Sequence, residues 1–407
     1  MKQPVGNQSR PHVVALDGLR GFAALVVTFY HGITHYEPSL ISRIHYAPLD
    51  KMGSMHDFFM KALFMVFDGE AAVTIFFVLS GFVLSLSLSS SAQGQTRGAV
   101  ARDFIVKRIL RIYPALIVCI FCFFLMAHIM SAYGMRDLSG ISVYKYLRNA
   151  LLLSYLVHGP SWSIQLEIMA APIILVVFLS IMRFGYIALF FIMSFSVCFV
   201  EYPRLPYPVH SLQIYLFSFL VGIFLSSNAV RNASIIIPRH LLAVALLAFI
   251  LCRHLVPYHD GASNLAHAMF AGLVVFAALR DGDSLPHRIL VSRPAQILGR
   301  ISYSFYLFNV PFLYLAWAII NKHVSDPPAH ATALGVASAV FATAVGIPAA
   351  ILSEKYIERA GIRLGKAIVS FWAVNETPGV RGGDAGDPEA RPQGVGQGAG
   401  AVAAEGA

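Results

Sequence analysis

The first apolar run of the chain carries an arginine and a histidine eleven residues apart, Arg20 and His31. An α-helix turns about 100° per residue, so these side chains point within about 20° of each other, ~16 Å apart along the axis. Asp17, Thr28 and His35 fall on or near the same face. Ionisable side chains inside a membrane are costly and generally face a bundle interior or a water-filled cavity. We therefore expect this helix to form one wall of a polar site.

Each of these residues also has an ordinary interpretation when it is taken alone. Arg20 could extend its charged end to the cytoplasmic headgroups, and His31 could be an interfacial residue with one hydrogen bond. The occurrence of both on one stripe, with Asp17 beside them, favours a site. The two residues are too far apart to share one proton, so we expect them to act at separate points on one wall.

A carboxylate follows a tryptophan in the stretch 160–167 (PSWSIQLE). Ser163 and Glu167 are i,i+4 neighbours on a predicted helix, and we expect Glu167 one turn inside the outer boundary, at a depth similar to His31. A histidine and a carboxylate at one depth could perform general acid–base chemistry. The alternative is a water-exposed glutamate beside Trp162, which would then be an ordinary interfacial anchor.

Three basic residues, Lys107, Arg108 and Arg111, are three or four positions apart at the cytoplasmic end of a predicted helix. This spacing gathers them on one side of the helix. Such a cluster could hold the phosphates of a nucleotide-like ligand. The alternative is anchoring beside anionic lipid, which the residues alone favour.

Two further stretches could line a passage through the bundle. Ser80 and Gly81 fall near the bilayer centre, where small residues let another helix or a thin ligand approach closely. Ser302, Tyr306 and Asn309 share a face at i, i+4 and i+7, and either line a channel or bond a neighbouring helix.

Other reactive residues indicate structure rather than chemistry. The charges of the stretch 353–359 (SEKYIER) are interpreted as a solvated helix end. The four cysteines all lie in apolar segments, and we expect buried apolar thiols and no metal site. Cys119 and Cys122 have a metal-like spacing, but no second pair or histidine accompanies them. The other two cysteines are Cys198 and Cys252.

The composition identifies the class of protein in which these residues must be positioned. Of 407 residues, 57% are hydrophobic and 13% are charged, whereas about a quarter of the residues in a soluble domain are charged. We predict an all-α polytopic membrane protein. No cleavable signal peptide is evident, because residues 1–12 are polar and the first apolar run lacks a small-residue cleavage pattern.

The apolar runs predict about ten transmembrane helices, given the ~20 residues that are needed to cross ~30 Å of hydrocarbon. The fifth and eighth are short. A further apolar piece, 150–157, is too short to span and is expected to be re-entrant or interfacial. The predicted spans are 13–35, 71–90, 109–130, 163–182, 184–200, 210–226, 240–256, 264–279, 301–320 and 331–352.

The distribution of Lys and Arg gives the orientation. With the N-terminus in the cytoplasm, the inside segments hold 20 of the 30 basic residues, the outside segments nine, and the first span holds Arg20. Both termini are therefore expected in the cytoplasm. The net charge of +9 is mostly this bias, so no nucleic-acid partner is expected.

Six stretches, in order, resemble the acyltransferase-3 family of membrane-embedded enzymes that O-acylate sugars of envelope polysaccharides and related acceptors. The resemblance covers residues 14 to about 360. The stretches are 16–20 (LDGLR) with Arg20 and His31 at Arg-x10-His spacing, 76–82 (FFVLSGF), 107–114 (KRILRIYP), 161–167 (SWSIQLE), 299–307 (GRISYSFYL) and 356–359 (YIER).

The resemblance implies a role for several of these residues. Arg20 and His31 would be an essential pair, with His31 as the base that deprotonates the acceptor hydroxyl. Glu167 would be a carboxylate of the site. Ser80 and Gly81 would line the path of the acyl-bearing arm, and the residues that grip the phosphates of acyl-CoA would be Lys107, Arg108 and Arg111.

Two positions depart from the family pattern. The motif in the ninth span commonly ends in histidine, and here that residue is Asn309, which cannot shuttle a proton. The acidic residue that often lies two places before Phe76 is here Thr74. These changes affect the expected substrate more than the expected reaction.

The sequence thus predicts O-acyl transfer, with acetyl as the expected group, from cytoplasmic acyl-CoA to a glycan or lipid-linked sugar hydroxyl outside an inner membrane. No permanently bound cofactor is expected; membrane lipid is a partner, and separate envelope-biosynthesis proteins are possible partners. The alternatives are a transporter or flippase of a lipid-linked sugar and an acyltransferase for small molecules. The expected divisions are a cytoplasmic segment 1–12, the transmembrane domain 13–360, and a cytoplasmic tail 361–407 that is largely disordered from about 376.

Overall fold

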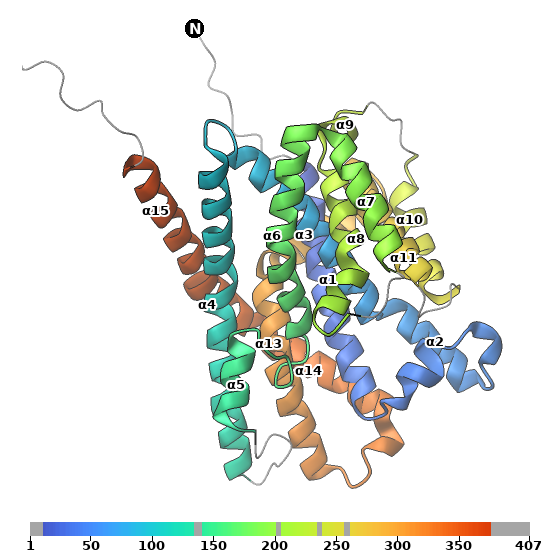
Figure 1. Ribbon diagram of the computed structural model, residues 1–407. Coiled ribbons are helices and arrows are strands. Elements are labelled where there is room, and N and C mark those ends of the chain that lie inside the picture. Colours follow the sequence, from blue (N-terminus) through green and yellow to red (C-terminus); the bar gives the residue numbers. More distant parts are fainter. Residues whose placement is uncertain (1–10, 134–140, 201–204, 234–237, 256–260, 376–407) are drawn as a thin grey trace, which may run out of the picture.

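The protein is a bundle of long helices (Figure 1). The computed structural model describes residues 11–133, 141–200, 205–233, 238–255 and 261–375, and these residues form helices but no strands. The principal helices are α1 (Pro11–His35), α3 (Gly69–Ser91), α4 (Arg97–Ala132), α6 (Ser161–Phe184), α7 (Tyr186–Val200), α8 (Val209–Leu225), α10 (Leu241–Leu255), α11 (Gly261–Arg280), α13 (Arg293–His323) and α14 (Ala331–Ser353).

Each predicted span coincides with one of these helices. Among the described residues, six helical segments are long and apolar enough to cross a membrane, and α7, α8 and α10 are shorter apolar helices. The prediction of a polytopic all-α membrane protein is confirmed. The count of ten crossings and the cytoplasmic position of both termini stay predictions.

The short elements lie mainly at the two ends of the bundle (Figure 1). Asp68 shows how local sequence starts a long helix, because its carboxylate accepts hydrogen bonds from the N–H groups of Glu70 and Ala71 at the start of α3. The short elements are η1 (Ile41–His45), η2 (Leu49–Lys51), α2 (Met55–Val66), α5 (Val143–Ala150), α9 (Asn228–Arg231), α12 (Leu285–Leu290), η3 (Pro328–His330) and η4 (Glu354–Glu358). A longer helix, α15 (Arg359–Asn375), follows η4.

Glycines bring the central helices into backbone contact. A Cβ atom added to Gly81 of α3 would lie 2.1 Å from the carbonyl oxygen of Phe219 on α8, and one added to Gly222 would lie 2.0 Å from that of Val78. Small residues at such positions let membrane helices approach closely. Gly81, predicted to line the path of the acyl-bearing arm, is therefore a packing residue between α3 and α8.

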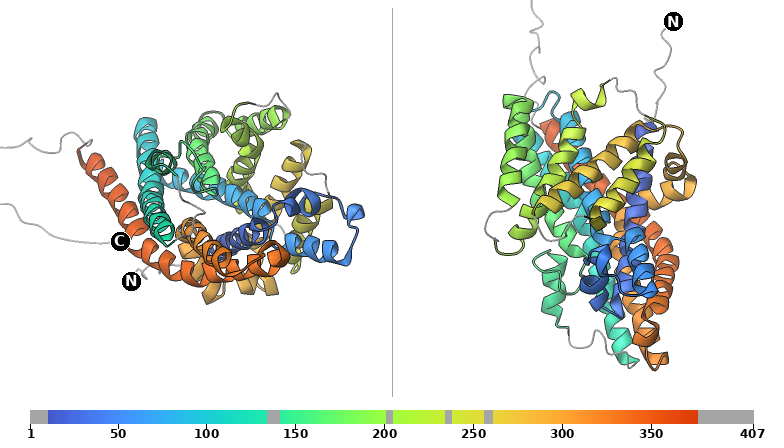
Figure 2. Two further views of the ribbon diagram at one scale, coloured as in Figure 1. Left: turned by 90° about the horizontal axis from the view of Figure 1, so that it is seen from below. Right: turned by 90° about the vertical axis from the view of Figure 1, so that its right-hand side faces the viewer.

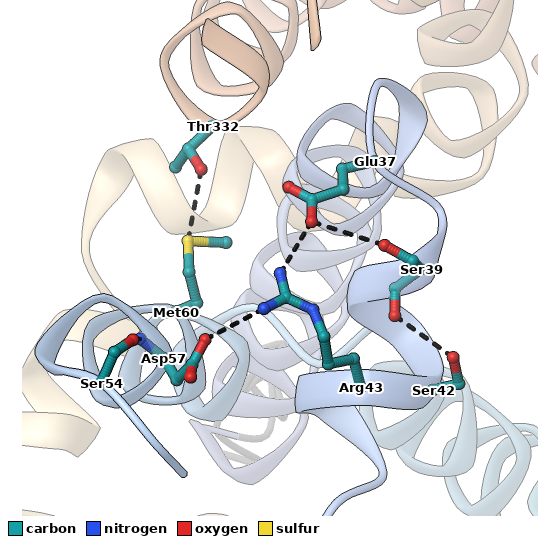
Figure 3. A network of polar contacts seen from close by, with 8 residues as sticks. All are labelled: Glu37, Ser39, Ser42, Arg43, Ser54, Asp57, Met60 and Thr332. Carbon is teal, nitrogen blue, oxygen red and sulfur yellow. Dashed lines mark hydrogen bonds and ion pairs between the residues drawn. The ribbon is translucent and has the colours of Figure 1, made fainter. Parts of the chain in front are cut away.

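A small cap follows the C-terminal end of α1. Arg43 of η1 forms ion pairs with Glu37 at 2.7 Å and with Asp57 of α2 at 3.2 Å (Figure 3). The buried ammonium of Lys61 donates hydrogen bonds to three carbonyl oxygens at 2.7–3.0 Å, those of Ile44, His45 and Ala47. These bonds fix η1 and α2 together beside the helix end that carries His31.

The C-terminal region differs from its sequence interpretation. The stretch 353–359 is not a solvated helix end, because Glu354 and Glu358 of η4 are only 7% and 5% exposed. Residues 361–375 continue as α15, which packs against α4, and Figure 2 shows the two helices side by side at one edge. The predicted disorder from about residue 376 lies outside the described residues.

The cysteines also differ from the expectation of four buried thiols. Cys119 and Cys252 are buried, whereas Cys122 and Cys198 are exposed on the surface of the bundle. Cys122 lies one turn beyond Cys119, at the edge of the buried face of α4, and its exposed apolar neighbours Phe121 and Leu125 indicate a lipid-facing surface.

The Gly81 contact predicts a stability effect. Gly81→Ala should lower the unfolding free energy of the detergent-solubilised protein by about 1–3 kcal/mol, since the added methyl group overpacks the interface with α8. Gly98→Ala is the matched control, because nothing lies within 4 Å of its added Cβ. Thermal unfolding of both variants measures the difference, and equal melting temperatures would contradict the close packing.

Candidate active site

A cavity of about 770 Å³, part of it open to solvent, lies between α1, α3, α4, α6 and α13. One part of its wall is cationic and another is apolar. The lining residues are Arg20, Phe76, Phe77, Leu79, Ser80, Val83, Leu84, Arg108, Arg111, Ile112, Ser163, Ile164, Glu167, Ser302, Tyr303 and Tyr306.

A buried ion pair crosses the cavity wall between α4 and α6. The guanidinium of Arg108 contacts the carboxylate of Glu167, and the Ser80 hydroxyl donates a 2.7 Å hydrogen bond to the same carboxylate. The side chain of Arg108 is 7% exposed and that of Glu167 is 26% exposed, so the carboxylate is the more open partner. Arg108 is thus paired within the protein rather than free at the end of a helix.

This arrangement corrects the predicted grouping of Glu167. The sequence placed its carboxylate at the depth of His31, whereas the structure joins it to Arg108 and Ser80. Glu167 is six residues into α6, about 9 Å along the axis from the N-terminal end of the helix. It therefore groups with Arg108, and electrostatically with Arg20, rather than with His31.

Two more arginines, Arg20 and Arg111, line the same cavity. They come from α1 and α4 and interact electrostatically with each other. Asp17 is one turn before Arg20 and interacts electrostatically with both arginines. The predicted cationic character of this part of the site is therefore present in the fold.

Polar groups of α6 and α13 close the opposite part of the cavity. The hydroxyl groups of Ser163 and Tyr306 are 2.7 Å apart, and the Tyr306 hydroxyl donates to the carbonyl oxygen of Pro160 at 3.1 Å. Ser302 lies one turn before Tyr306 in the same lining. Both polar positions of α13 therefore face the cavity, as the i,i+4 spacing predicted.

Asn309 is separate from this lining. Its side-chain nitrogen donates a 2.6 Å hydrogen bond to the hydroxyl of Thr28 on α1, and Thr28 in turn donates to the carbonyl oxygen of Ala24. The amide oxygen of Asn309 is buried without a hydrogen-bond partner in the described part of the chain. The residue that replaces the family histidine thus joins α13 to α1, one turn before His31.

The remaining candidates lie at the edge of the site or away from it. His31 is outside the cavity lining, towards the C-terminal end of α1. The Cα atom of Lys107 faces α15, because a Cβ on Gly365 would lie 3.5 Å from it. The ring of Trp162 packs edge-on against that of Phe77 and at a tilt against that of Tyr215, and it does not line the cavity.

Sequence reasoning missed His158, a buried residue in the connection between α5 and α6. Its Nε2 atom is 2.9 Å from the carbonyl oxygen of Leu307, and its Nδ1 atom is 2.7 Å from the hydroxyl of Ser161. A carbonyl can only accept, so Nε2 carries the proton and Nδ1 accepts from Ser161. Burial lowers the pKa of His158 to about 4, against the raising effect of the bond to Leu307, and the ring is neutral at pH 7.

A proline provides the partner of His158. Pro311 lies four residues after Leu307 and has no N–H, so the Leu307 carbonyl loses its helical hydrogen bond and is free to accept another. His158 also interacts electrostatically with His31. The spacing of Leu307 and Pro311 shows in the sequence that the Leu307 carbonyl lacks its helical hydrogen bond. The residue that donates to this carbonyl, His158, lies in a connection far away in the sequence.

The fold and this cavity define a multi-pass membrane protein with a charged interior site. The family model for an acyltransferase domain, Acyl_transf_3, matches residues 13–351. The chain therefore belongs to the acyltransferase-3 family and is a membrane acyltransferase. No curated protein and no solved structure gave a significant match.

The ion pair between Arg108 and Glu167 predicts strong energetic coupling. Glu167→Gln leaves a buried guanidinium without its carboxylate and should lower the unfolding free energy by about 3–5 kcal/mol. Adding Arg108→Gln to this variant should restore part of the loss. Thermal or denaturant unfolding of the two single variants and the double variant measures the coupling energy.

The exposed pair of Arg43 and Glu37 is the matched control for that cycle. Its side chains are 49% and 33% exposed, so its coupling energy should stay below about 1 kcal/mol. Equal coupling in the two pairs would contradict the assignment of Arg108 and Glu167 as a buried structural pair.

Proposed function

We propose that this acyltransferase moves an acyl group, with acetyl as our expectation, from acyl-CoA on the cytoplasmic side to a glycan hydroxyl on the outer side of an inner membrane. The observation that carries the proposal is the cavity inside the bundle, which is lined both by Arg20 and Arg111 and by apolar side chains. The acceptor is a polysaccharide or a glycan precursor, including a lipid-linked sugar. Membrane lipid and separate envelope-biosynthesis proteins are its further partners, and acyl-CoA is a substrate rather than a resident cofactor.

The cavity suits the chemistry of an acyl-CoA donor. Guanidinium groups bind phosphate through charge-assisted hydrogen bonds. Arg111 of the 107–111 cluster lines the cavity, and within the described part of the chain it makes no direct ion pair of the kind that joins Arg108 to Glu167. The side chains of Phe76, Leu79 and Val83 offer an apolar surface to the acyl-bearing arm.

The transfer needs a base at the acceptor and little further activation, because the donor thioester is already reactive. In the proposed step, the acceptor hydroxyl oxygen forms a bond to the acyl carbon while its proton passes to His31. The bond between the acyl carbon and sulfur then breaks, and the proton leaves with the thiol of free CoA. The position of His31 towards the outer end of α1 supports an acceptor that approaches from that side.

Replacement of His31 tests its role as the base. His31→Ala should lower the acyl-transfer rate by at least about 100-fold, since general-base catalysis typically contributes 10²–10⁴-fold. The measurement is mass spectrometry of surface-polysaccharide acylation in cells with and without the protein or its variants. The exposed His56 supplies the control His56→Ala, and retained transfer by His31→Ala would refute the assignment.

Replacement of Arg111 tests the donor. Arg111→Gln should weaken CoA binding to the purified protein at least about tenfold, because a hydrogen bond to a charged group contributes about 1.5–3 kcal/mol. Calorimetric titration measures the affinity, and Arg300→Gln, at an exposed position of α13, is the matched control. A flippase of lipid-linked sugar would instead be indifferent to CoA and to this substitution.

A further inference from the structure

The junction of α14 and α15 buries two carboxylates that the proposed reaction has not used. η4 is a single π-helical turn, in which the N–H of Arg359 bonds to the carbonyl oxygen of Glu354, five residues earlier. Such turns insert one residue into a helix and are frequent at functional sites. Here the turn lies between Ser353 and Arg359, and both Glu354 and Glu358 are buried.

The two carboxylates have different surroundings. Glu354 forms a 2.7 Å ion pair with Arg359, whose side chain is half exposed. Glu358 points into the bundle, where it accepts a 3.1 Å hydrogen bond from the hydroxyl of Ser304 on α13. Because η4 packs against both α4 and α13, Glu358 lies behind the wall to which Tyr303 contributes, next to Ser304 in the chain.

Glu358 interacts electrostatically with two arginines of the cavity, Arg111 and Arg20. Asp17 on α1 also interacts with both, and Glu167 interacts with Arg20. These two guanidiniums also interact with each other as like charges. Among the described residues, no carboxylate makes a direct ion pair with either of them, in contrast to Arg108. Two cations near each other in a bundle interior repel strongly, since the effective dielectric constant is low.

We propose that Glu358 is a counter-charge of an anion site formed by Arg20 and Arg111, placed on the η4 side of the cavity as Asp17 is placed on α1. It offsets their repulsion while the cavity is empty, and a phosphate group of the acyl donor takes over this function on binding. The identity of that anion rests on the proposed function, whereas the counter-charge itself does not. Glu358 is a positioning residue, because it acts through the arginines and does not touch the donor.

A counter-charge has an effect opposite to that of an ordinary structural contact. A carboxylate behind the arginines repels an incoming phosphate, so its neutralisation should strengthen anion binding and slow product release. Loss of a merely structural contact would loosen the arginines and weaken binding. The sign of the change in affinity therefore separates the two roles.

The test compares CoA binding to the full-length wild-type protein, Glu358→Gln, Glu358→Asp and Glu354→Gln in lipid nanodiscs. Glu358→Gln should bind CoA about fivefold more tightly or better, a coupling of ordinary size between neighbouring groups. Its maximal acyl-transfer rate should fall together with its KM for acyl-CoA. Glu358→Asp keeps the charge and should restore wild-type affinity, and Glu354→Gln should leave the affinity unchanged.

Unchanged or weaker CoA binding by folded Glu358→Gln would overturn the proposal. If this variant does not fold alone, CoA or pyrophosphate added during solubilisation should restore its folding, because the anion replaces the missing charge; failure of both ligands would also overturn it. Pyrophosphate binding tests the counter-charge separately from the identity of the donor. If the wild-type protein binds pyrophosphate but neither binds CoA nor transfers acetyl, the proposed acyl-CoA donor is contradicted. Tighter pyrophosphate binding by Glu358→Gln would still support the role of Glu358 as a counter-charge.

Discussion

A guanidinium in the interior of a membrane bundle must be matched by negative charge within the protein, and Arg108 on α4 meets Glu167 on α6. Once this pair forms, the two helices have a fixed register across the cavity, and Ser80 of α3 joins them through the same carboxylate. Removing two charges from water is unfavourable unless their geometry and hydrogen bonds compensate. The pair therefore restricts how α3, α4 and α6 can pack, and the cavity forms beside it.

Backbone groups obey the same constraint, because lipid offers them no hydrogen bonds. Pro311 frees the carbonyl of Leu307, which accepts from His158. Pro114 similarly frees the carbonyl of Leu110, and Gly361 of α15 approaches it so closely that a Cβ would lie 2.2 Å from the oxygen. Each proline thus creates a polar position on a helix surface that a second element covers.

The helices could be predicted from the sequence because long apolar runs report directly on segments that cross a membrane. All ten expected segments are helical. Of the three polar residues expected on one face of α13, Ser302 and Tyr306 line the cavity, whereas Asn309 bonds to the neighbouring helix α1. These predictions depend only on periodicity within one helix. They do not need the positions of neighbouring helices.

The site was less predictable because it depends on contacts between helices. The pairing of Glu167 with Arg108 depends on how far α4 and α6 are shifted relative to each other, which the sequence does not give. Whether Gly81 packs against a helix or lines a ligand path depends on the position of α8. Glu358 could not be identified as buried from the sequence, since a run of alternating charges is usually exposed and the burial of this residue depends on the packing of η4 against α4 and α13. His158 lies in a connection, where periodicity gives no signal.

The glycine contacts also affect how tolerance to mutation should be interpreted in this protein. Gly18, Gly81, Gly222 and Gly299 each face a carbonyl oxygen about 2.0–2.1 Å from where a Cβ would be, so any larger residue separates two helices. In a saturation-mutagenesis screen scored by function, these positions would be as intolerant as a catalytic base. None of them lines the cavity. A ranking by intolerance alone would therefore not distinguish residues that are needed for helix packing from residues that are needed for catalysis. Parallel measurement of protein abundance would distinguish them, because only packing residues lower it.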